Sequence, residues 1–284
     1  MTPPDRNLRP RVLAAFVLVP LFVAVAYVGR LVFLATVELL AIAAAVEFYR
    51  LPAAKPYRAR LVPGVALALA LPAWAYWAPA SAGVLTLLLV VAVLGIALAQ
   101  LLDPAGEEAI ASTAVTVFGA LYIGGLLSGL VLVREYPRER PGMAYAVGAA
   151  LLAVPIVLTW INDTAAYAVG RRWGRRRLLP RVSPGKSVEG ALGALVATIA
   201  LAVPVCWGVN RAVPLFRPVD MLAIGTLVGL AAPVGDLMES LWKRDAGVKD
   251  SSALIPGHGG VLDRFDSILV TVPVFYVYLC LVAA

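Results

Sequence analysis

The chain has 284 residues, of which 61% are hydrophobic and 14% are charged, and its mean hydropathy is +0.88. Soluble domains carry roughly a quarter of charged residues, so this composition excludes a soluble fold. It also excludes a disordered chain, which would be poor in apolar residues. The sequence therefore predicts a polytopic membrane protein. The net charge of +7 then indicates orientation in the membrane, and we expect no nucleic-acid partner.

Apolar runs long enough to cross a hydrocarbon core of roughly 30 Å occur nine times along the chain. They lie near residues 12–29, 31–49, 61–79, 83–102, 110–133, 143–169, 188–209, 219–242 and 267–284. We expect an all-α protein with about nine transmembrane helices in one membrane domain, residues 1–284. Residues 1–150 would form lipid-facing, dimer or scaffold helices, and residues 151–284 the catalytic helices and loops. A signal peptide is an alternative interpretation of residues 1–29, but no small-residue cleavage site follows.

The distribution of basic residues predicts the orientation. With nine spans, the N-terminus lies on the same side as the loops after the second, fourth, sixth and eighth helices. These segments hold 18 Lys and Arg residues, and the opposite side holds 6. Because basic loops stay on the cytoplasmic side, we expect a cytoplasmic N-terminus and location in the cell membrane. The acidic residues Asp163, Asp236, Asp263 and Asp266 all fall at the cytoplasmic ends of their helices, with Asp163 ending the sixth.

The eighth apolar run ends in a dense polar stretch. Asp236, Ser240 and Lys243 share one helix face at i, i+4 and i+7, with Glu239 beside them. A carboxylate inside a membrane span is costly and usually faces a cavity, a partner or an ion. An Asp236–Lys243 pair that merely anchors the helix end is the alternative. We favour a functional role because the acids lie inside the span.

A glycine-rich loop precedes the last run. Residues 256–266 read Pro-Gly-His-Gly-Gly-Val-Leu-Asp-Arg-Phe-Asp. The glycines allow close backbone approach, and the N–H groups of such a loop and of the helix after it can bind phosphate. His258 is the only histidine, and we expect it to organise the loop. Asp263 and Asp266 lie at i, i+3, and oxygen ligands without His or Cys companions suit Mg²⁺ rather than zinc.

A third polar segment surrounds the sixth run. Asp163 lies ahead of a basic stretch at residues 171–177, and residues 183–187 read Ser-Pro-Gly-Lys-Ser. Gly-Lys-Ser imitates the end of a Walker A loop, but Pro180 replaces the required first glycine and no parallel strand precedes it. The basic stretch is either a topological signal and a patch for anionic lipid or, with the nearby Asp, Ser and Lys, a polyphosphate site.

Residues 240–266 resemble the signature of the phosphatidate cytidylyltransferases, the CDP-diacylglycerol synthases. They read Ser-Leu-Trp-Lys-Arg, four residues, Lys-Asp, five residues, and then the Pro-Gly-His-Gly-Gly-Val-Leu-Asp-Arg-Phe-Asp loop, and this spacing matches the family without a gap. The segments at 162–170 and 183–190 are similar to the same family, and so is Glu47 before Phe-Tyr-Arg-Leu. Good matching covers roughly residues 160–267. Gly185 departs from the pattern, which has a basic or polar residue beside Lys186.

The resemblance implies that CTP and phosphatidate react to give CDP-diacylglycerol and pyrophosphate. It further implies a Mg²⁺-dependent helical enzyme, dimeric, whose active site opens to the cytoplasm and the lipid. The family's paired metal centre would be held by Asp236 and Asp263. The catalytic residues would be Asp236, Asp263, Lys249 and Asp266. Substrate would be bound by Asp163, Ser183, Lys186, Ser240, Lys243, Arg244, Gly257, His258, Gly259, Gly260 and Arg264.

The acidic and basic residues named above are the types that this transfer reaction needs. A phosphate monoester is anionic near neutral pH, so it needs charge neutralisation and in-line alignment rather than a strong base. An ion-coupled transporter is a competing hypothesis, but it predicts inverted repeats and acids near the bilayer midplane. A related enzyme that uses another lipid phosphate would keep the same fold and remains an alternative.

Overall fold

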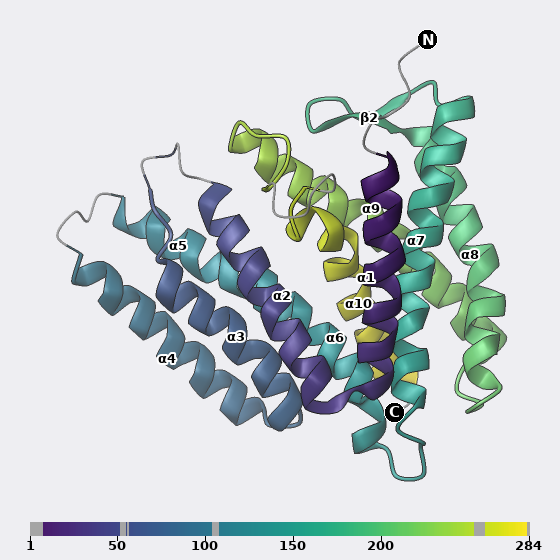
Figure 1. Cartoon of the computed structure of the whole chain (residues 1–284), viewed down its shortest axis with the longest axis horizontal. Helices are drawn as coiled ribbons and strands as arrows, with labels where there is room; N and C mark the ends of the chain where they lie inside the picture. The colour runs from purple at the N-terminus through teal and green to yellow at the C-terminus, as the bar shows by residue number, and fades with distance from the viewer. Residues whose placement is uncertain (1–7, 52–54, 56, 104–107, 253–258, 283–284) are drawn as a thin grey trace.

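The computed structural model describes residues 8–51, 55, 57–103, 108–252 and 259–282. Helices dominate its architecture (Figure 1). They are α1 (Leu8–Val28), α2 (Arg30–Arg50), α3 (Leu61–Trp77), α4 (Ala82–Leu101), α5 (Ala109–Ala120), α6 (Leu126–Glu135), α7 (Val147–Trp173), α8 (Val188–Asn210), α9 (Pro218–Asp245) and α10 (Leu262–Val282). A π-helical turn, η2 (Leu121–Gly125), joins α5 to α6, and a 3₁₀ turn, η3 (Tyr136–Glu139), follows α6.

The prediction of an all-α polytopic membrane protein is confirmed. Within the described part of the chain, seven helical segments are long and apolar enough to cross a membrane, and α5, η2, α6 and η3 together form one of them. The apolar part of α1 whose side chains are described, Phe16–Val28, and the shorter apolar helix α3 complete the expected set of nine. α4 is almost uncovered by the rest of the protein and turns leucine and valine side chains outward, as a lipid-facing helix does.

Two helix boundaries differ from the expectation near the polar segments. α7 continues to Trp173 instead of ending near residue 169, and α10 begins at Leu262 instead of near residue 267. Asp163 therefore lies inside α7 rather than at its end. The expected loop at 170–187 contains an antiparallel hairpin of β1 (Arg177–Leu179) and β2 (Ser183–Ser187). Its short, polar strands follow the extra turn of α7, which apolar periodicity alone does not reveal.

The helices pack as one body. α7, α8 and α9 pack against one another, and α10 lies against α9, α7 and α6. α2, α3 and α5 surround η2 and α6, α4 lies against α3 and α5, and α1 lies against α2 and α7. One hydrophobic cluster includes Phe33 of α2, Leu130 of α6, Leu158 of α7 and Phe275 of α10. Gly235 lets α9 approach α10 closely, because a Cβ there would overlap the backbone of Asp266 and Ser267.

Local sequence determines where several helices begin. Ser187 caps α8 by accepting a hydrogen bond from the N–H of Gly190 at 3.1 Å. Pro218 occupies the first turn of α9, where the missing N–H costs nothing. The tight junction between α1 and α2 needs a positive φ of 65° at Gly29. Arg134, fully buried on α6, holds this junction by donating hydrogen bonds to the carbonyls of Ala26 and Tyr27.

Candidate active site

A pocket of about 680 Å³ opens where α7, α8, α9 and the β1–β2 hairpin meet. This is the upper end of the molecule in Figure 1, where α1 begins and α9 ends. Asp163 of α7, Lys186 of β2 and Asp236 of α9 line it together with Arg171 and Arg177. Both signs of charge therefore line one cavity, which we call the α7–α9 pocket.

Asp236 occupies the centre of the polar contacts in this pocket. Its Oδ2 lies 2.5 Å from Nζ of Lys186, and its Oδ1 accepts a hydrogen bond from Ser240 at 3.2 Å. Asp163 interacts electrostatically with both Asp236 and Lys186. The alternative Asp236–Lys243 anchor is wrong, because Lys243 pairs with Glu239 and Asp263 instead.

Asp263, in the first turn of α10, forms a second polar group beside the pocket. Its Oδ1 accepts a hydrogen bond from Nζ of Lys243 at 2.6 Å. Its Oδ2 accepts three, from the N–H of Ser251 at 3.0 Å, from the hydroxyl of Ser251 at 3.0 Å and from the N–H of Gly260 at 2.8 Å. A carboxylate offers about four lone-pair positions, so only Oδ1 keeps one for a further partner.

Glu47 of α2 holds the same loop from the opposite direction. It is 4% exposed, and its two oxygens accept hydrogen bonds from the N–H groups of Val261 (3.0 Å) and Leu262 (2.9 Å). The hydroxyl of Ser252 donates to it at 2.7 Å, and the hydroxyl of Ser251 lies 3.1 Å from it and shares its one proton between Glu47 and Asp263. A carboxylate at the N-terminus of α10 also complements the helix dipole. Glu47 thus fixes the loop that positions Asp263.

Carboxylates outnumber lysines in this region. Asp266 interacts electrostatically with Asp236 and Glu239 and so connects the two groups. Glu239 is fully buried, and neither of its oxygens accepts an aligned hydrogen bond from a described residue. The five carboxylates have only Lys186 and Lys243 as lysine partners within ion-pair distance among the described residues. The five are Asp163, Asp236, Glu239, Asp263 and Asp266.

This excess of carboxylates, of which Glu239 is buried and Asp236, Asp263 and Asp266 are half-buried, fits a hard cation. Among the described residues, no three His, Cys, Asp or Glu side chains converge closely enough to hold a metal ion by themselves. Mg²⁺ commonly takes only one or two carboxylates and fills its remaining positions with water and substrate phosphate. Oε2 of Glu239, which has no hydrogen-bond partner among the described residues, and the free position on Asp263 are therefore suitable for a cation that arrives with a polyphosphate.

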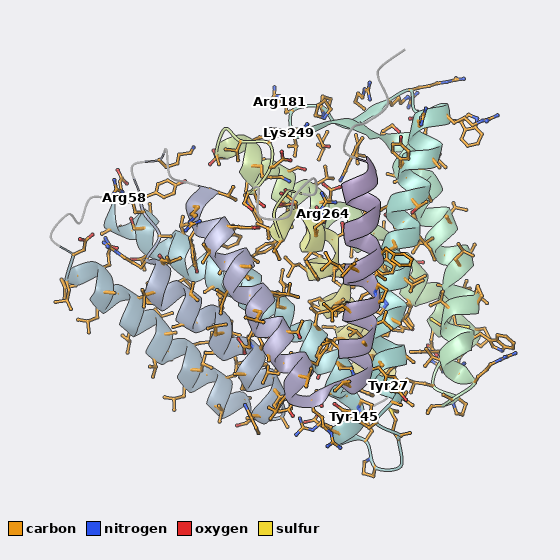
Figure 2. The ribbon with its side chains drawn as sticks, viewed as in Figure 1. Tyr27, Arg58, Tyr145, Arg181, Lys249 and Arg264 are labelled. Atoms are coloured by element: carbon orange, nitrogen blue, oxygen red, sulfur yellow. The ribbon has the colours of Figure 1, made fainter. Side chains whose placement is uncertain are left out.

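The other residues expected at the site lie around its rim. Lys249 and Arg264 are exposed at the upper end of the molecule (Figure 2). Arg244 bridges to the hairpin by donating to the carbonyl of Val182 at 3.4 Å. Ser183 begins β2, outside the lining of the pocket. Gly259 lies in the described end of the glycine-rich loop, whereas Gly257 and His258 fall outside the described residues.

The hairpin is held against α8 by Glu189. Its carboxylate accepts hydrogen bonds from the N–H groups of Arg175 at 2.9 Å and Arg176 at 3.1 Å. Ser187 caps the same helix, so β2 ends and α8 begins within two residues. This junction places Lys186, the last residue but one of β2, opposite Asp236.

Comparison with known proteins assigns the family. A family model described as the cytidylyltransferase family matches residues 9–282. The chain belongs to the cytidylyltransferase family. The match extends over the N-terminal helices as well as the polar segments.

Named relatives of this cytidylyltransferase-family protein are bacterial. A phosphatidate cytidylyltransferase of Haemophilus influenzae is 47% identical over 129 residues, which are 45% of each chain. The Pseudomonas aeruginosa phosphatidate cytidylyltransferase is 40% identical over 159 residues, 55% of this chain and 54% of the relative. That of Bacillus subtilis is 36% identical over 162 residues, 57% and 56% of the two chains. The aligned part thus spans about half the length of these relatives.

Some site residues of this cytidylyltransferase-family protein were missed in the sequence. Arg171 and Tyr167 line the pocket at i+8 and i+4 from Asp163, and Arg171 donates a hydrogen bond to the Tyr167 hydroxyl at 3.3 Å. Their helical spacing was visible, but it falls partly beyond the expected helix end at residue 169. Arg177 lies in the basic stretch, where nothing distinguished it from its neighbours. Glu47 was noted only by resemblance, because its partners lie more than 200 residues away.

Proposed function

We propose that this protein transfers the cytidylyl group of CTP to phosphatidate. One oxygen of the phosphatidate phosphate attacks the α-phosphorus of CTP, a new P–O–P linkage forms, and the bond to the β-phosphate breaks to release pyrophosphate. The products are CDP-diacylglycerol and pyrophosphate. The observation that carries the proposal is the α7–α9 pocket, which gathers Lys186, Arg171 and Arg177 around acidic residues at one end of a membrane bundle. The family and the names of the relatives support the same reaction.

The basic groups of the pocket have a direct role in this proposal. Lys186, Arg171 and Arg177 neutralise the phosphates of CTP and hold the triphosphate against the pocket wall. Positioned positive groups lower the barrier by stabilising charge on the leaving pyrophosphate. Lys186 is already held by Asp236 at 2.5 Å, so its ammonium is oriented before substrate binds.

The acidic residues would hold Mg²⁺. We assign Asp236 and Asp263 to the cation, with Asp266 and Glu239 adding negative charge nearby. When bound, the cation supplies further neutralisation of the triphosphate and of the departing pyrophosphate. Asp236 would hold the cation, Lys186 beside it would contact phosphate, and the loop held by Glu47 would keep Asp263 in place.

The lipid substrate enters from the bilayer. The pocket lies at one end of the membrane-spanning helices α7, α8 and α9, at the edge of the lipid. The diacylglycerol tails can therefore remain in lipid while the phosphate reaches the basic residues. The basic residues of this end support a cytoplasmic location, where CTP is present.

The decisive experiment uses the purified full chain in detergent with α-labelled CTP, Mg²⁺ and phosphatidate. We expect labelled CDP-lipid and an equal amount of pyrophosphate. A polyprenyl phosphate replaces phosphatidate in a parallel reaction, and diacylglycerol without phosphate is the negative control. Absence of product with phosphatidate would refute the proposal, and product only with the polyprenyl phosphate would assign the other lipid substrate.

A further inference from the structure

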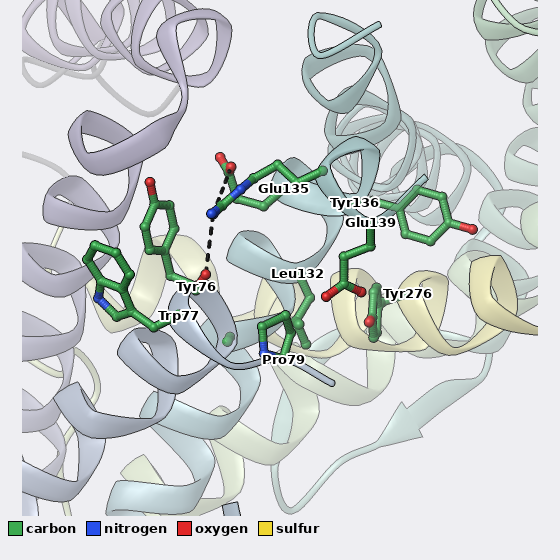
Figure 3. Close-up of a pocket in the computed structure, with 10 residues that line it drawn as sticks. Tyr76, Trp77, Pro79, Leu132, Glu135, Tyr136, Glu139 and Tyr276 are labelled. Carbon is green, nitrogen blue, oxygen red and sulfur yellow. Dashed lines mark hydrogen bonds and ion pairs between the residues drawn. The ribbon is translucent and has the colours of Figure 1, made fainter. Parts of the chain in front are cut away.

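A second cavity, of about 220 Å³, lies at the end of the molecule opposite the α7–α9 pocket. It is formed by the end of α3, by α6 with η3, and by α10. Figure 3 shows its lining, with Tyr76 and Trp77 on one side and Tyr136, Glu139 and Tyr276 on the other. We call it the η3 cavity. The proposed transfer reaction gives it no role.

The η3 cavity contains a buried carboxylate oxygen that lacks a donor. Glu135 is 6% exposed, and its Oε1 accepts hydrogen bonds from the Tyr145 hydroxyl at 2.6 Å and from the Arg30 N–H at 3.1 Å. Burial, and then the hydrogen bond to Glu135, raise the pKa of Tyr145 above its usual value, so this donor keeps its proton. Oε2 of Glu135 has no hydrogen-bond partner among the described residues, and Arg138 approaches it only to 3.6 Å.

The Arg138 guanidinium contacts Tyr76 as well as Glu135. It donates a hydrogen bond to the carbonyl of Tyr76 at 3.3 Å and lies 4.6 Å from the centre of the Tyr76 ring. Glu139, the last residue of η3, also lines the cavity and makes no ion pair with a described cation. Within the lining, the carboxylates of Glu135 and Glu139 therefore accompany one arginine and four aromatic rings. Behind the lining, Arg134 forms an ion pair with Oε1 of Glu135 at 4.0 Å and leaves Oε2 to Arg138.

The two carboxylates and the aromatic rings of the η3 cavity together favour an organic ammonium group as its ligand. An ammonium can donate to Oε2 of Glu135 and to Glu139 while its methylene groups contact the aromatic rings, whose faces attract cations. A metal ion would gain nothing from the aromatic walls. The volume is below the roughly 300–1,000 Å³ of pockets for drug-sized ligands, so it suits a small headgroup rather than a whole molecule.

The position of the cavity indicates where the ammonium comes from. Trp77 is largely exposed at the end of α3, as are aromatic residues at membrane–water interfaces. The Arg138 side chain is 41% exposed beside the cavity and can contact a phosphate without leaving Glu135. We propose that the η3 cavity binds the primary-amine headgroup of a zwitterionic phospholipid, with the amine between Glu135 and Glu139 and the phosphate near Arg138.

The test measures lipid binding to the purified full chain by native mass spectrometry in detergent. Phosphatidylethanolamine and phosphatidylglycerol with identical acyl chains are titrated separately. We expect the ethanolamine lipid to bind more tightly, and Glu139→Gln to weaken it by about tenfold, as loss of one charge-assisted hydrogen bond implies. Glu108→Gln is the matched control, because Glu108 is an exposed acid on the other end of the bundle, at the start of α5.

The other outcomes are equally informative. Competition by free phosphorylethanolamine, with the same dependence on Glu139, would support the ammonium site and show that a soluble amine is sufficient. Equal binding of the two lipids, or equal effects of Glu139→Gln and Glu108→Gln, would overturn the proposal. Glu135→Gln is a poorer first variant because Glu135 also holds Arg30 and Tyr145. An unchanged melting temperature of Glu139→Gln shows that the fold is retained.

Discussion

At the scale of single residues, Asp236 joins the acidic and basic parts of the α7–α9 pocket. It contacts Lys186 at 2.5 Å and accepts a hydrogen bond from Ser240. Asp236 is partly exposed at the wall of the pocket, so its side chain contributes little to the packing of α9. A change at this residue should therefore affect chemistry more than folding.

Asp236→Asn should lower kcat/KM for CTP by about 100-fold or more, because it removes a charge that would hold the cation at the reacting phosphates. The melting temperature should change little. Asp245→Asn is the matched control, since Asp245 is an exposed acid near the end of the same helix and pairs with Lys55 at 3.0 Å. Normal turnover of Asp236→Asn at saturating Mg²⁺ would contradict the metal assignment.

Unlike a change at Asp236, a change at Glu47 should affect folding as well as activity. Glu47→Ala removes the acceptor of the Val261 and Leu262 N–H groups and one acceptor of the Ser251 and Ser252 hydroxyls, so we expect a loss of about 3 kcal/mol in stability. The melting temperature and the CTP turnover should fall together, and Gln should restore part of both. Glu38→Gln on the same helix is the control, because Oε2 of Glu38 has no partner among the described residues. Equal melting temperatures of Glu47→Ala and the wild type would show that the loop does not depend on this residue.

At the scale of elements, the loop between α9 and α10 and the end of α7 both carry exposed cations. Lys249 lies in that loop, and Arg172 lies in the last turn of α7 with its guanidinium 5.2 Å from the ring centre of Trp173. The two residues have similar exposure but different neighbours, so they separate a phosphate-binding role from a topological one.

Lys249→Ala should reduce kcat/KM for CTP by roughly 10-fold or more, the effect of one charge-assisted hydrogen bond to phosphate. Arg172→Ala should have a much smaller effect. Pyrophosphate release measured against CTP concentration distinguishes them, and a monodisperse elution profile controls for folding. If the two variants lose the same activity, the α9–α10 loop does not bind the triphosphate.

The elements also show what could be predicted from the sequence and what could not. Apolar runs predicted each helix, since length and hydrophobicity alone determine a membrane span. The extension of α7 to Trp173 and the hairpin were not predicted, because the segment is polar and basic and its structure depends on Glu189 and Ser187 of the neighbouring helix. Residues close in sequence, such as Asp236 and Ser240, were grouped correctly. The contact of Asp236 with Lys186, 50 residues away, required the fold.

At the scale of the whole molecule, the two cavities lie at opposite ends of the bundle. The first and last described helices also begin and end at opposite ends (Figure 1). α1 begins at the end that carries the α7–α9 pocket, and α10 ends at the other. The basic residues are concentrated at the first of these ends, so the structure and the charge count define one testable topology. The homodimer stays a prediction.

Cysteine labelling should place the α7–α9 pocket in the cytoplasm. In a background without Cys206 and Cys280, a cysteine at Ser183 or Asp250 should resist an impermeant reagent in intact cells, and one at Ala144 should react. Asp250 is a better probe than Ser251, because Ser251 donates hydrogen bonds to Glu47 and Asp263. Labelling at Ser183 and Asp250 but not at Ala144 would reverse the orientation.

The contact of Glu47 with the loop before α10 makes the C-terminal half of the chain depend on the N-terminal half. The motifs that identify its chemistry lie after residue 160, yet the carboxylate that holds their loop belongs to the second helix. A fragment that starts after the turn at residues 140–146 would contain every acid of the pocket and still lack this support. Two fragments cut at that turn could recover activity only by reassembling, so a split version would report the docking of the two halves.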